Sequence, residues 1–208
     1  MDLLLDYVCP SVKDRERELV PQLLSCLSAL QLSLLLSGCG GIGGAPPTKN
    51  EPAAAAAMAI ETYDRNGDGQ LSGDELSNAS ALIASGRRID RNGDNVLTKD
   101  EIQVRMEELE PQADYIPLDV RILTKGRPLV GAELTLSPAP FMGENYQTFT
   151  GTTDEAGSCF LQGDGKELPG VPVGFYHARV VQSAQGIDLT RGIEIADDTT
   201  GNRLEISL

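Results

Sequence analysis

The sequence predicts an α+β protein of two domains, in which a small helical domain precedes an antiparallel β-sandwich of about seven strands. Two observations lead to this prediction. A twelve-residue acidic segment with helix-forming flanks occurs twice, at residues 64–75 (loop 1) and 90–101 (loop 2). From residue 115 onward apolar and polar residues alternate, which is the period of a half-buried strand and not of a helix.

Loop 1, DRNGDGQLSGDE, has oxygen-bearing side chains at its first, third, fifth, ninth and twelfth positions. These side chains are Asp64, Asn66, Asp68, Ser72 and Glu75. Gln70 at the seventh position offers a backbone carbonyl, and Gly69 at the sixth can take the positive φ of a sharp turn. The spacing suits a hard cation with six to eight oxygen ligands, which favours Ca²⁺ over Mg²⁺. A surface turn rich in Asp, Asn and Gly is the alternative interpretation.

Loop 2, DRNGDNVLTKDE, repeats the same order of ligand types. Its ligands are Asp90, Asn92, Asp94, the carbonyl of Val96, Thr98 and Glu101. Two unrelated turns would not keep every ligand position in register, so the repeat predicts two calcium sites. Over residues 53–111 the chain therefore resembles the EF-hand family. That resemblance implies paired helix–loop–helix units whose loops meet through the apolar eighth positions, Leu71 and Leu97.

The sequence departs from the EF-hand pattern in two places, the sixth position of loop 2 and the length of the segment between the loops. Asn95 replaces glycine at the sixth position of loop 2, and asparagine is the next most tolerant residue in the left-handed conformation. We therefore expect loop 2 to bind calcium more weakly than loop 1. The segment between the loops is short for an exiting and an entering helix, so we expect one kinked or shared helix around residues 77–88, with Gly86 as its weak point.

The first part of the chain has the features of a secretory signal. A charged start precedes an uncharged, leucine-rich run at residues 19–38, which ends in Leu36-Ser37-Gly38-Cys39. This ending resembles the lipobox of bacterial lipoproteins, which implies a signal peptide at 1–38 and lipidation of Cys39. A retained transmembrane helix and a buried helix are the alternatives. The Gly- and Pro-rich residues 39–52 are expected to form a flexible linker.

The second domain is expected at residues 115–208. The pieces GRPLVGAELTL, TTDEAGSCFL and LPGVPVGFYHARVV resemble the carboxypeptidase regulatory-like, or transthyretin-like, β-sandwich. Their shared features are turns and core positions, so the resemblance implies a fold and no chemistry. Cys159 lies within a predicted strand as a small apolar residue, and His177, the only histidine, lacks the partners that catalysis would need. We therefore predict that the protein is not an enzyme.

Charge and composition narrow the possible partners. The net charge of −14 argues against nucleic acid and suits cation binding. We expect a calcium-binding lipoprotein of the bacterial cell envelope, held to the membrane by its lipid, in which the sandwich is structural or binds an envelope protein or polysaccharide. The alternative is a dockerin-like adhesion or scaffold module that binds a protein partner in the presence of calcium. From the sequence alone we expect calcium to stabilise only the helical domain.

Overall fold

The structure is a computed structural model, and it describes residues 51–112, 114–144, 146–163, 170–197 and 203–208. All of them lie within one compact unit, Gly41–Leu208. The predicted signal peptide, the lipidation site Cys39 and the linker up to residue 50 lie outside the described residues, as does the run that could form a retained membrane helix. Among the helices that are described, none is long and apolar enough to cross a membrane.

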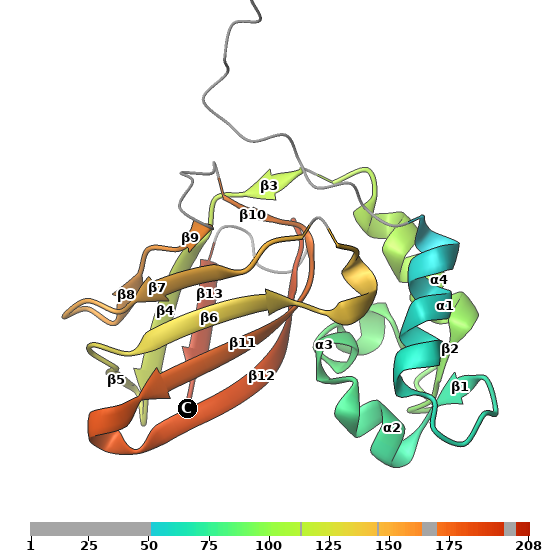
Figure 1. Cartoon of the computed structure of the whole chain (residues 1–208), viewed down its shortest axis with the longest axis horizontal. Coiled ribbons are helices and arrows are strands. Elements are labelled where there is room, and N and C mark those ends of the chain that lie inside the picture. The colour runs from blue at the N-terminus through green and yellow to red at the C-terminus, as the bar shows by residue number, and fades with distance from the viewer. Residues whose placement is uncertain (1–50, 113, 145, 164–169, 198–202) are drawn as a thin grey trace, which may run out of the picture. The chain divides into compact units, whose positions relative to one another are not determined.

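The helical region, residues 52–109, is built around two helices that flank the acidic loops (Figure 1). Helix α1 (Pro52–Tyr63) starts on a proline, whose missing N–H costs nothing at a first helical position, and leads directly into loop 1. Helix α4 (Lys99–Leu109) leaves loop 2 after the N-cap residue Thr98. Between the loops lie α2 (Gly73–Asn78), α3 (Ser80–Ile83) and the 3₁₀ helix η1 (Gly86–Arg88).

The expectation of one kinked or shared helix at residues 77–88 was wrong, because this segment is divided among three separate short helices. The first break is at Ala79, which leaves the helical conformation with φ −87° and ψ 45°. Just before it, Ser77 Oγ and Asn78 Nδ2 donate to the carbonyls of Gly73 and Asp74, and such local bonds compete with a regular helix. The expected weak point at Gly86 is present, with φ +53°.

The β region, residues 115–208, consists mainly of two sheets that share one core (Figure 1). The five-stranded sheet has the order β12-β11-β6-β7-β9, and the four-stranded sheet has β13-β4-β5 with β8 paired to β4. Strands β3 and β10 form a separate pair. The strands are β3 Tyr115–Ile116, β4 Asp119–Thr124, β5 Arg127–Pro128, β6 Glu133–Pro138, β7 Phe149–Thr152, β8 Ser158–Cys159, β9 Gln162–Gly163, β10 Val171–Pro172, β11 Gly174–Gln182, β12 Ile187–Ile195 and β13 Arg203–Ser207.

The α+β fold class is confirmed. The direction of one strand, however, could not be predicted from the alternation of residues. Most strand pairs are antiparallel, but β13 runs parallel to β4, with Leu204 opposite Val120. Period-two alternation reports which face a residue occupies and carries no information on strand direction. Two 3₁₀ helices, η2 (Pro140–Met142) and η3 (Ser183–Gln185), connect strands of the five-stranded sheet.

The helical and β regions share one continuous apolar core. The alanines of α1 (Ala55, Ala56 and Ala59) belong to the same buried cluster as Phe141 of η2. At a second contact, a Cβ atom on Gly192 of β12 would collide with the backbone of Ser80 in α3, so this position requires glycine. The sequence-based division into residues 53–111 and 115–208 stays a prediction, and the structure adds that the two parts pack closely.

Candidate metal centre

Loop 1 brings three carboxylates together, two from the segment after α1 and one from the first turn of α2. One oxygen from each of Asp64, Asp68 and Glu75 lies within 4.8 Å of the others. Glu75 is buried, Asp64 is half-buried and Asp68 is exposed, so the cluster opens to solvent on one side. These residues hold the first, fifth and twelfth positions of the loop, as the sequence predicts.

Hydrogen bonds from the backbone hold these carboxylates in place. Glu75 reaches across the loop, where one of its oxygens accepts the N–H groups of Arg65 and Asn66, both at 3.0 Å. Asp64 accepts from the N–H groups of Gly67 and Gly69, at 2.6 and 2.9 Å. The backbone of loop 1 is therefore held by its first ligand, Asp64, and by its last ligand, Glu75.

The same bonds favour the charged form of the first ligand. The N–H groups of Gly69 and Gly67 lower the pKa of Asp64 below its usual value. A carboxylate that accepts backbone hydrogen bonds keeps its charge more readily. Asp64 is thus anionic at neutral pH, as a calcium ligand must be.

The two loops meet as the EF-hand resemblance implies. Residues of β1 (Gln70–Leu71) pair with residues of β2 (Leu97–Thr98) in antiparallel register, with Leu71 opposite Leu97. Both leucine side chains are almost fully buried. This short ladder pairs the seventh and eighth residues of loop 1 with the ninth and eighth residues of loop 2, and so relates the two candidate sites to each other.

Loop 2 repeats part of the loop 1 geometry. Asp90 accepts from the N–H groups of Gly93 and Asn95, at 2.7 and 3.1 Å, as Asp64 does in loop 1. Asn95 has φ +61°, so the expected left-handed conformation at the sixth position is present. Asn92 and Asp94 are exposed, and the side chain of Val96 is half-buried.

The last ligand of loop 2 is held differently. Glu101 accepts hydrogen bonds from both the N–H and the hydroxyl group of Thr98, at 3.0 and 2.9 Å. Glu75 also accepts from the N–H group three positions earlier, that of Ser72 at 3.3 Å, but in addition it reaches across loop 1 to Arg65 and Asn66, whereas the described bonds of Glu101 reach only Thr98. Accordingly, among the described acidic groups, those of loop 2 are not gathered as closely as Asp64, Asp68 and Glu75.

Two arginines that the sequence analysis did not consider lie beside loop 2. The guanidinium of Arg87, from η1, packs over Gly93 at the fourth position of the loop. Arg91, at the second position, forms an ion pair with Glu108 of α4. Positive charge close to the ligands opposes the binding of a cation. The short segment between the loops was the available signal, because it carries Arg87 and Arg88 directly before Ile89 and Asp90.

The residues present fit a hard cation such as Ca²⁺. Each loop offers carboxylate, amide, hydroxyl and backbone carbonyl oxygens, and no nitrogen or sulfur donor from histidine or cysteine. In loop 1 three carboxylates converge, and in both loops the backbone turns through positive φ at the sixth position. The first loop therefore has the better-formed arrangement of the two.

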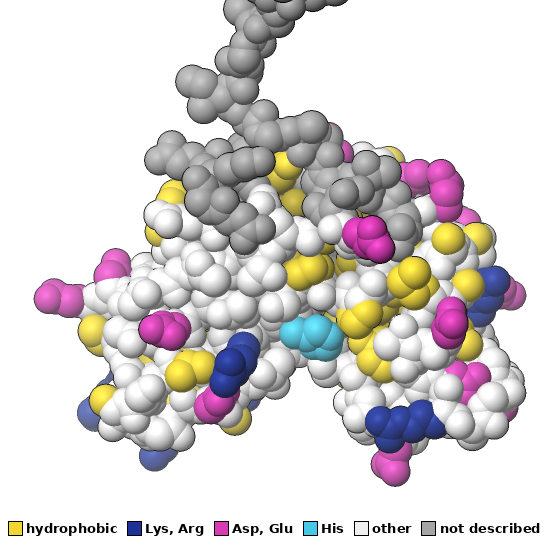
Figure 2. All heavy atoms as spheres, viewed as in Figure 1, with side chains coloured by type: hydrophobic (Ala, Val, Ile, Leu, Met, Phe, Trp, Pro, Cys, Tyr) yellow, Lys and Arg dark blue, Asp and Glu magenta, His cyan; other side chains and the backbone are white. Residues whose placement is uncertain are grey.

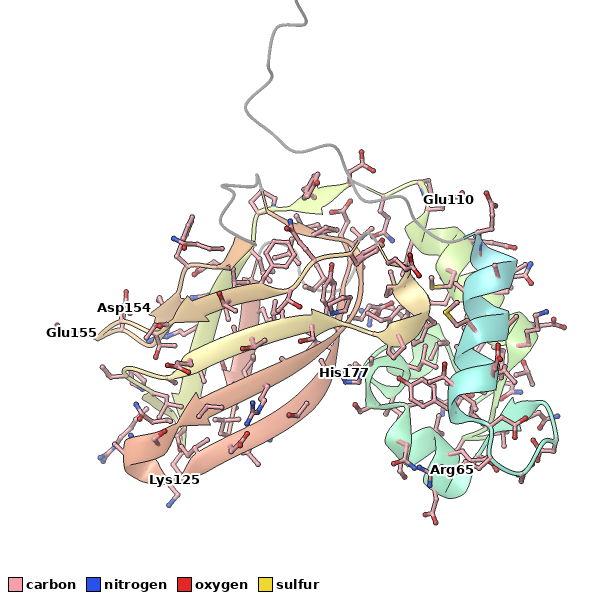
Figure 3. All side chains as sticks on the ribbon, in the orientation of Figure 1. Arg65, Glu110, Lys125, Asp154, Glu155 and His177 are labelled. Carbon is pink, nitrogen blue, oxygen red and sulfur yellow. The ribbon has the colours of Figure 1, made fainter. Side chains whose placement is uncertain are left out.

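The β region contains two groups that could be reactive, and each is in an unreactive setting. Burial, with a smaller effect of the Asp154 charge, raises the pKa of Cys159 to about 11, so the thiolate is scarce at neutral pH. Burial lowers the pKa of His177 on β11, whose Nδ1 lies 3.4 Å from Ser80 Oγ in α3. Figure 3 shows His177 pointing from the sheet toward α3. The pair lies at a packing contact between the two regions.

Comparison with known proteins agrees with this geometry. The EF hand family model matches residues 57–79 and 87–106, which include most of both loops and their flanking helices. No curated protein sequence matches the chain.

Two solved structures resemble parts of the chain at low similarity. One is the Bacillus anthracis TIE protein (21% identity, TM-score 0.31, 46% of this chain) and the other is (S)-allantoin synthase (17% identity, TM-score 0.34, 74% of this chain). The chain spans 16% and 65% of the lengths of these proteins, and likeness at this level supports no assignment of function. The chain thus carries an EF-hand pair, which supports calcium binding, followed by a β-rich region.

Proposed function

We propose that the protein is a calcium-binding lipoprotein of the bacterial cell envelope, in which a two-site EF-hand module is joined to a β-sandwich with a structural or binding role. The observation that carries the calcium part is the convergence of Asp64, Asp68 and Glu75 in a loop that matches the EF hand family model. The metal would supply positive charge that holds these carboxylates together.

The two sites are proposed to differ in affinity, with loop 1 the stronger. Support comes from the left-handed Asn95 in loop 2, from the bonds of Glu101, which reach only Thr98, and from the guanidinium of Arg87 over Gly93. Each of these either strains loop 2, holds a ligand away from the centre of the loop or repels a cation. Affinities in the range of about 10⁻⁶ to 10⁻³ M are expected for such sites.

The envelope location rests on the sequence around Cys39. We expect Cys39 to become the acylated first residue of the mature protein, because the ending Leu-Ser-Gly-Cys follows an uncharged apolar run. An anionic membrane surface does not attract such a strongly anionic protein, so the protein would need a lipid anchor to stay on the membrane. Changing Cys39→Ala should release the protein from the membrane fraction. If the variant stays in the membrane fraction after a carbonate wash, the apolar run before Cys39 would instead be a retained transmembrane helix.

A non-catalytic role is proposed for the β region. Its cysteine is buried with a raised pKa, and its histidine packs against α3. We expect this region to present a surface to an envelope protein or polysaccharide, or to hold the EF-hand pair in position. Capture of one dominant protein partner from envelope extract, lost on addition of chelator, would favour the dockerin-like alternative.

The proposal is tested by titrating the full chain, freed of metal with a chelator, with Ca²⁺ in a calorimeter. Two binding events of different affinity are expected, and magnesium at the same concentration should bind much more weakly. A variant carrying both Glu75→Gln and Glu101→Gln serves as the control and should show no saturable heat. If the unmodified chain gives no saturable heat with Ca²⁺, calcium binding is wrong.

A further inference from the structure

The contact between the helical region and the β region contains a row of four alternating charges, which runs from the surface into the interior. Arg91 in loop 2 pairs with Glu108 of α4, and the other oxygen of Glu108 lies 3.0 Å from Arg105 Nη1. Arg105 Nε in turn donates to Glu194 Oε1 of β12 at 2.7 Å. The row therefore runs from the second position of a calcium loop to a strand of the five-stranded sheet.

The end of this row in the β region is deeply buried. The side chains of Arg105 and Glu194 are only 2% and 1% exposed. The second oxygen of Glu194, Oε2, has no hydrogen-bond partner in the described part of the chain. A buried charge that loses its partner is strongly destabilising, so the position of Arg105 is constrained by Glu194.

Arg105 is also placed to respond to the calcium ligand of loop 2. It lies four residues after Glu101, and residues at this spacing lie on the same face of a helix, one turn apart. Glu101 in the first turn of α4 and Arg105 in the second therefore share one short helix, so a shift of this helix when Glu101 binds a metal would also move Arg105.

Loop 1 has its own contact with the β region, formed by aromatic rings. Tyr63, the residue before the first ligand, packs edge-on against Phe141 of η2, with ring centroids 6.4 Å apart. Phe141 is fully buried and packs in turn on Phe175 of β11 at 5.6 Å. Met142, next to Phe141, lines one small cavity together with Met106 and Leu109 of α4.

The position of η2 resembles that of a bound target. EF-hand sensors use a methionine-rich apolar groove to bind an apolar segment of another protein. Here the apolar faces of α1 and α4 are covered by Phe141 and Met142 of the same chain. Figure 2 shows the single histidine, in cyan, at the surface where the two regions meet, with hydrophobic side chains close by.

We infer that the β region is the built-in target of the EF-hand pair, and that residues far from the loops set calcium affinity. The inference rests on the proposed calcium binding. Phe141 acts on loop 1 through Tyr63, and Glu194 acts on loop 2 through Arg105, Glu108 and Arg91. Coupling is reciprocal, so calcium also stabilises the strands that these residues come from.

The first test measures calcium affinity at each loop of the full chain by NMR, with the backbone amides of Gly69 and Asn95 as reporters. Glu194→Gln removes the charge that holds Arg105, so Arg105 draws Glu108 away from Arg91. We expect the affinity of loop 2 to fall at least about fivefold, the lower end of typical coupling. Phe141→Leu keeps an apolar side chain, loses the ring contact, and should weaken loop 1 by a similar factor.

The matched control is Val180→Ala. Val180 is buried in β11 five residues beyond Phe175, toward the end of the strand farther from α1 (Figure 1). It should lower stability and leave both calcium affinities unchanged. If Glu194→Gln and Phe141→Leu fold and bind calcium as the unmodified chain does, the coupling is absent and the inference is wrong.

A second test needs no variant. Amide hydrogen exchange of the unmodified chain is compared with and without Ca²⁺. We expect calcium to slow exchange in β11 and β12 near Phe175 and Glu194. Slowing confined to residues 63–102 would overturn the inference while leaving calcium binding intact. A chain that binds no calcium at all would overturn the proposed function itself, so the two failures are distinguishable.

Discussion

Loop 1 and loop 2 have the same ligand types at the same positions, yet the structure gives them different surroundings. In loop 1 the last carboxylate, Glu75, is buried and spans the loop to Arg65 and Asn66. In loop 2 the corresponding Glu101 is held by Thr98. A repeated motif therefore fixes which atoms are available, while the neighbours decide how well those atoms are arranged before the metal arrives.

The difference between the loops extends to charge. Figure 3 shows Arg65, at the second position of loop 1, at the surface of the helical region, whereas the equivalent Arg91 is paired with Glu108. Arg87 adds a further positive charge over loop 2. Loop 1 thus contacts the β region through the apolar rings of Tyr63 and Phe141, and loop 2 is part of a charged network that continues into the β region.

The largest expected effect is that of removing calcium from the whole protein. Each occupied site at a hundredfold excess over Kd contributes about 2.7 kcal/mol, or a shift of about 5 to 10 °C for a domain of this size. Because the helical and β regions share a core, we expect one thermal transition that shifts as a whole. Calorimetry with and without chelator measures it.

The sequence alone favoured a different result, in which calcium stabilises only residues 53–111. That result would appear as two transitions, of which chelation moves one and leaves the other nearly unchanged. Its observation would show that the buried contact between Arg105 and Glu194 does not join the two regions cooperatively.

The next largest effect is expected from the twelfth ligands. Glu75→Gln removes an anionic ligand from the better-formed site and should weaken loop 1 at least about tenfold, which is about 1.4 kcal/mol. Glu101→Gln should cost loop 2 less, because among the described residues Glu101 does not converge with other carboxylates as Glu75 does. Calcium titrations of the two variants, side by side, provide the comparison. A larger loss in Glu101→Gln would reverse the assigned order of the loops.

The sixth position is Gly69 in loop 1 and Asn95 in loop 2, so the two residue types can be exchanged between the loops. Asn95 is held at φ +61°, which costs a non-glycine residue roughly 1 kcal/mol. Asn95→Gly should therefore tighten loop 2 about fivefold, and Gly69→Asn should weaken loop 1 by a similar factor. The same titration measures both. No change in either variant would mean that backbone strain at this position has no part in the difference between the loops.

The smallest effect is expected from pH. Burial lowers the pKa of His177 in the folded chain, so the unfolded chain takes up its proton first as the pH falls. Stability should therefore be constant above the unfolded pKa of about 6.5 and decrease below it. Urea unfolding at pH 7.5 and pH 6 measures this loss, which His177→Gln should remove. An equal loss in the variant would assign the effect to another group.

The sequence predicted those features that depend on local chemistry. The register of the two loops, the pairing of Leu71 with Leu97 and the left-handed Asn95 each follow from a few neighbouring residues. The alternation expected from residue 115 onward was also found in β4, where buried Val120 and Ile122 alternate with more exposed residues. Such features need no knowledge of how distant parts of the chain pack.

Features that depend on distant contacts were missed. The sequence analysis did not single out Arg105, although its spacing from Ile102 and Leu109 places it on the buried face of α4. Only the position of β12 reveals that Glu194 is its partner. The break at Ala79 and the parallel pairing of β13 likewise depend on the packed chain, since neither helix propensity nor alternation specifies them.

The central claim, that two EF-hand loops bind calcium with unequal strength, is tested most directly on the unmodified chain. Backbone amide signals of Gly69 and Asn95 are followed by NMR as Ca²⁺ is added to the metal-free protein. Both residues hold the sixth position of their loops, so each reports its own site. We predict that Gly69 reaches saturation at a lower calcium concentration than Asn95. Simultaneous saturation, or saturation of Asn95 first, would contradict the claim.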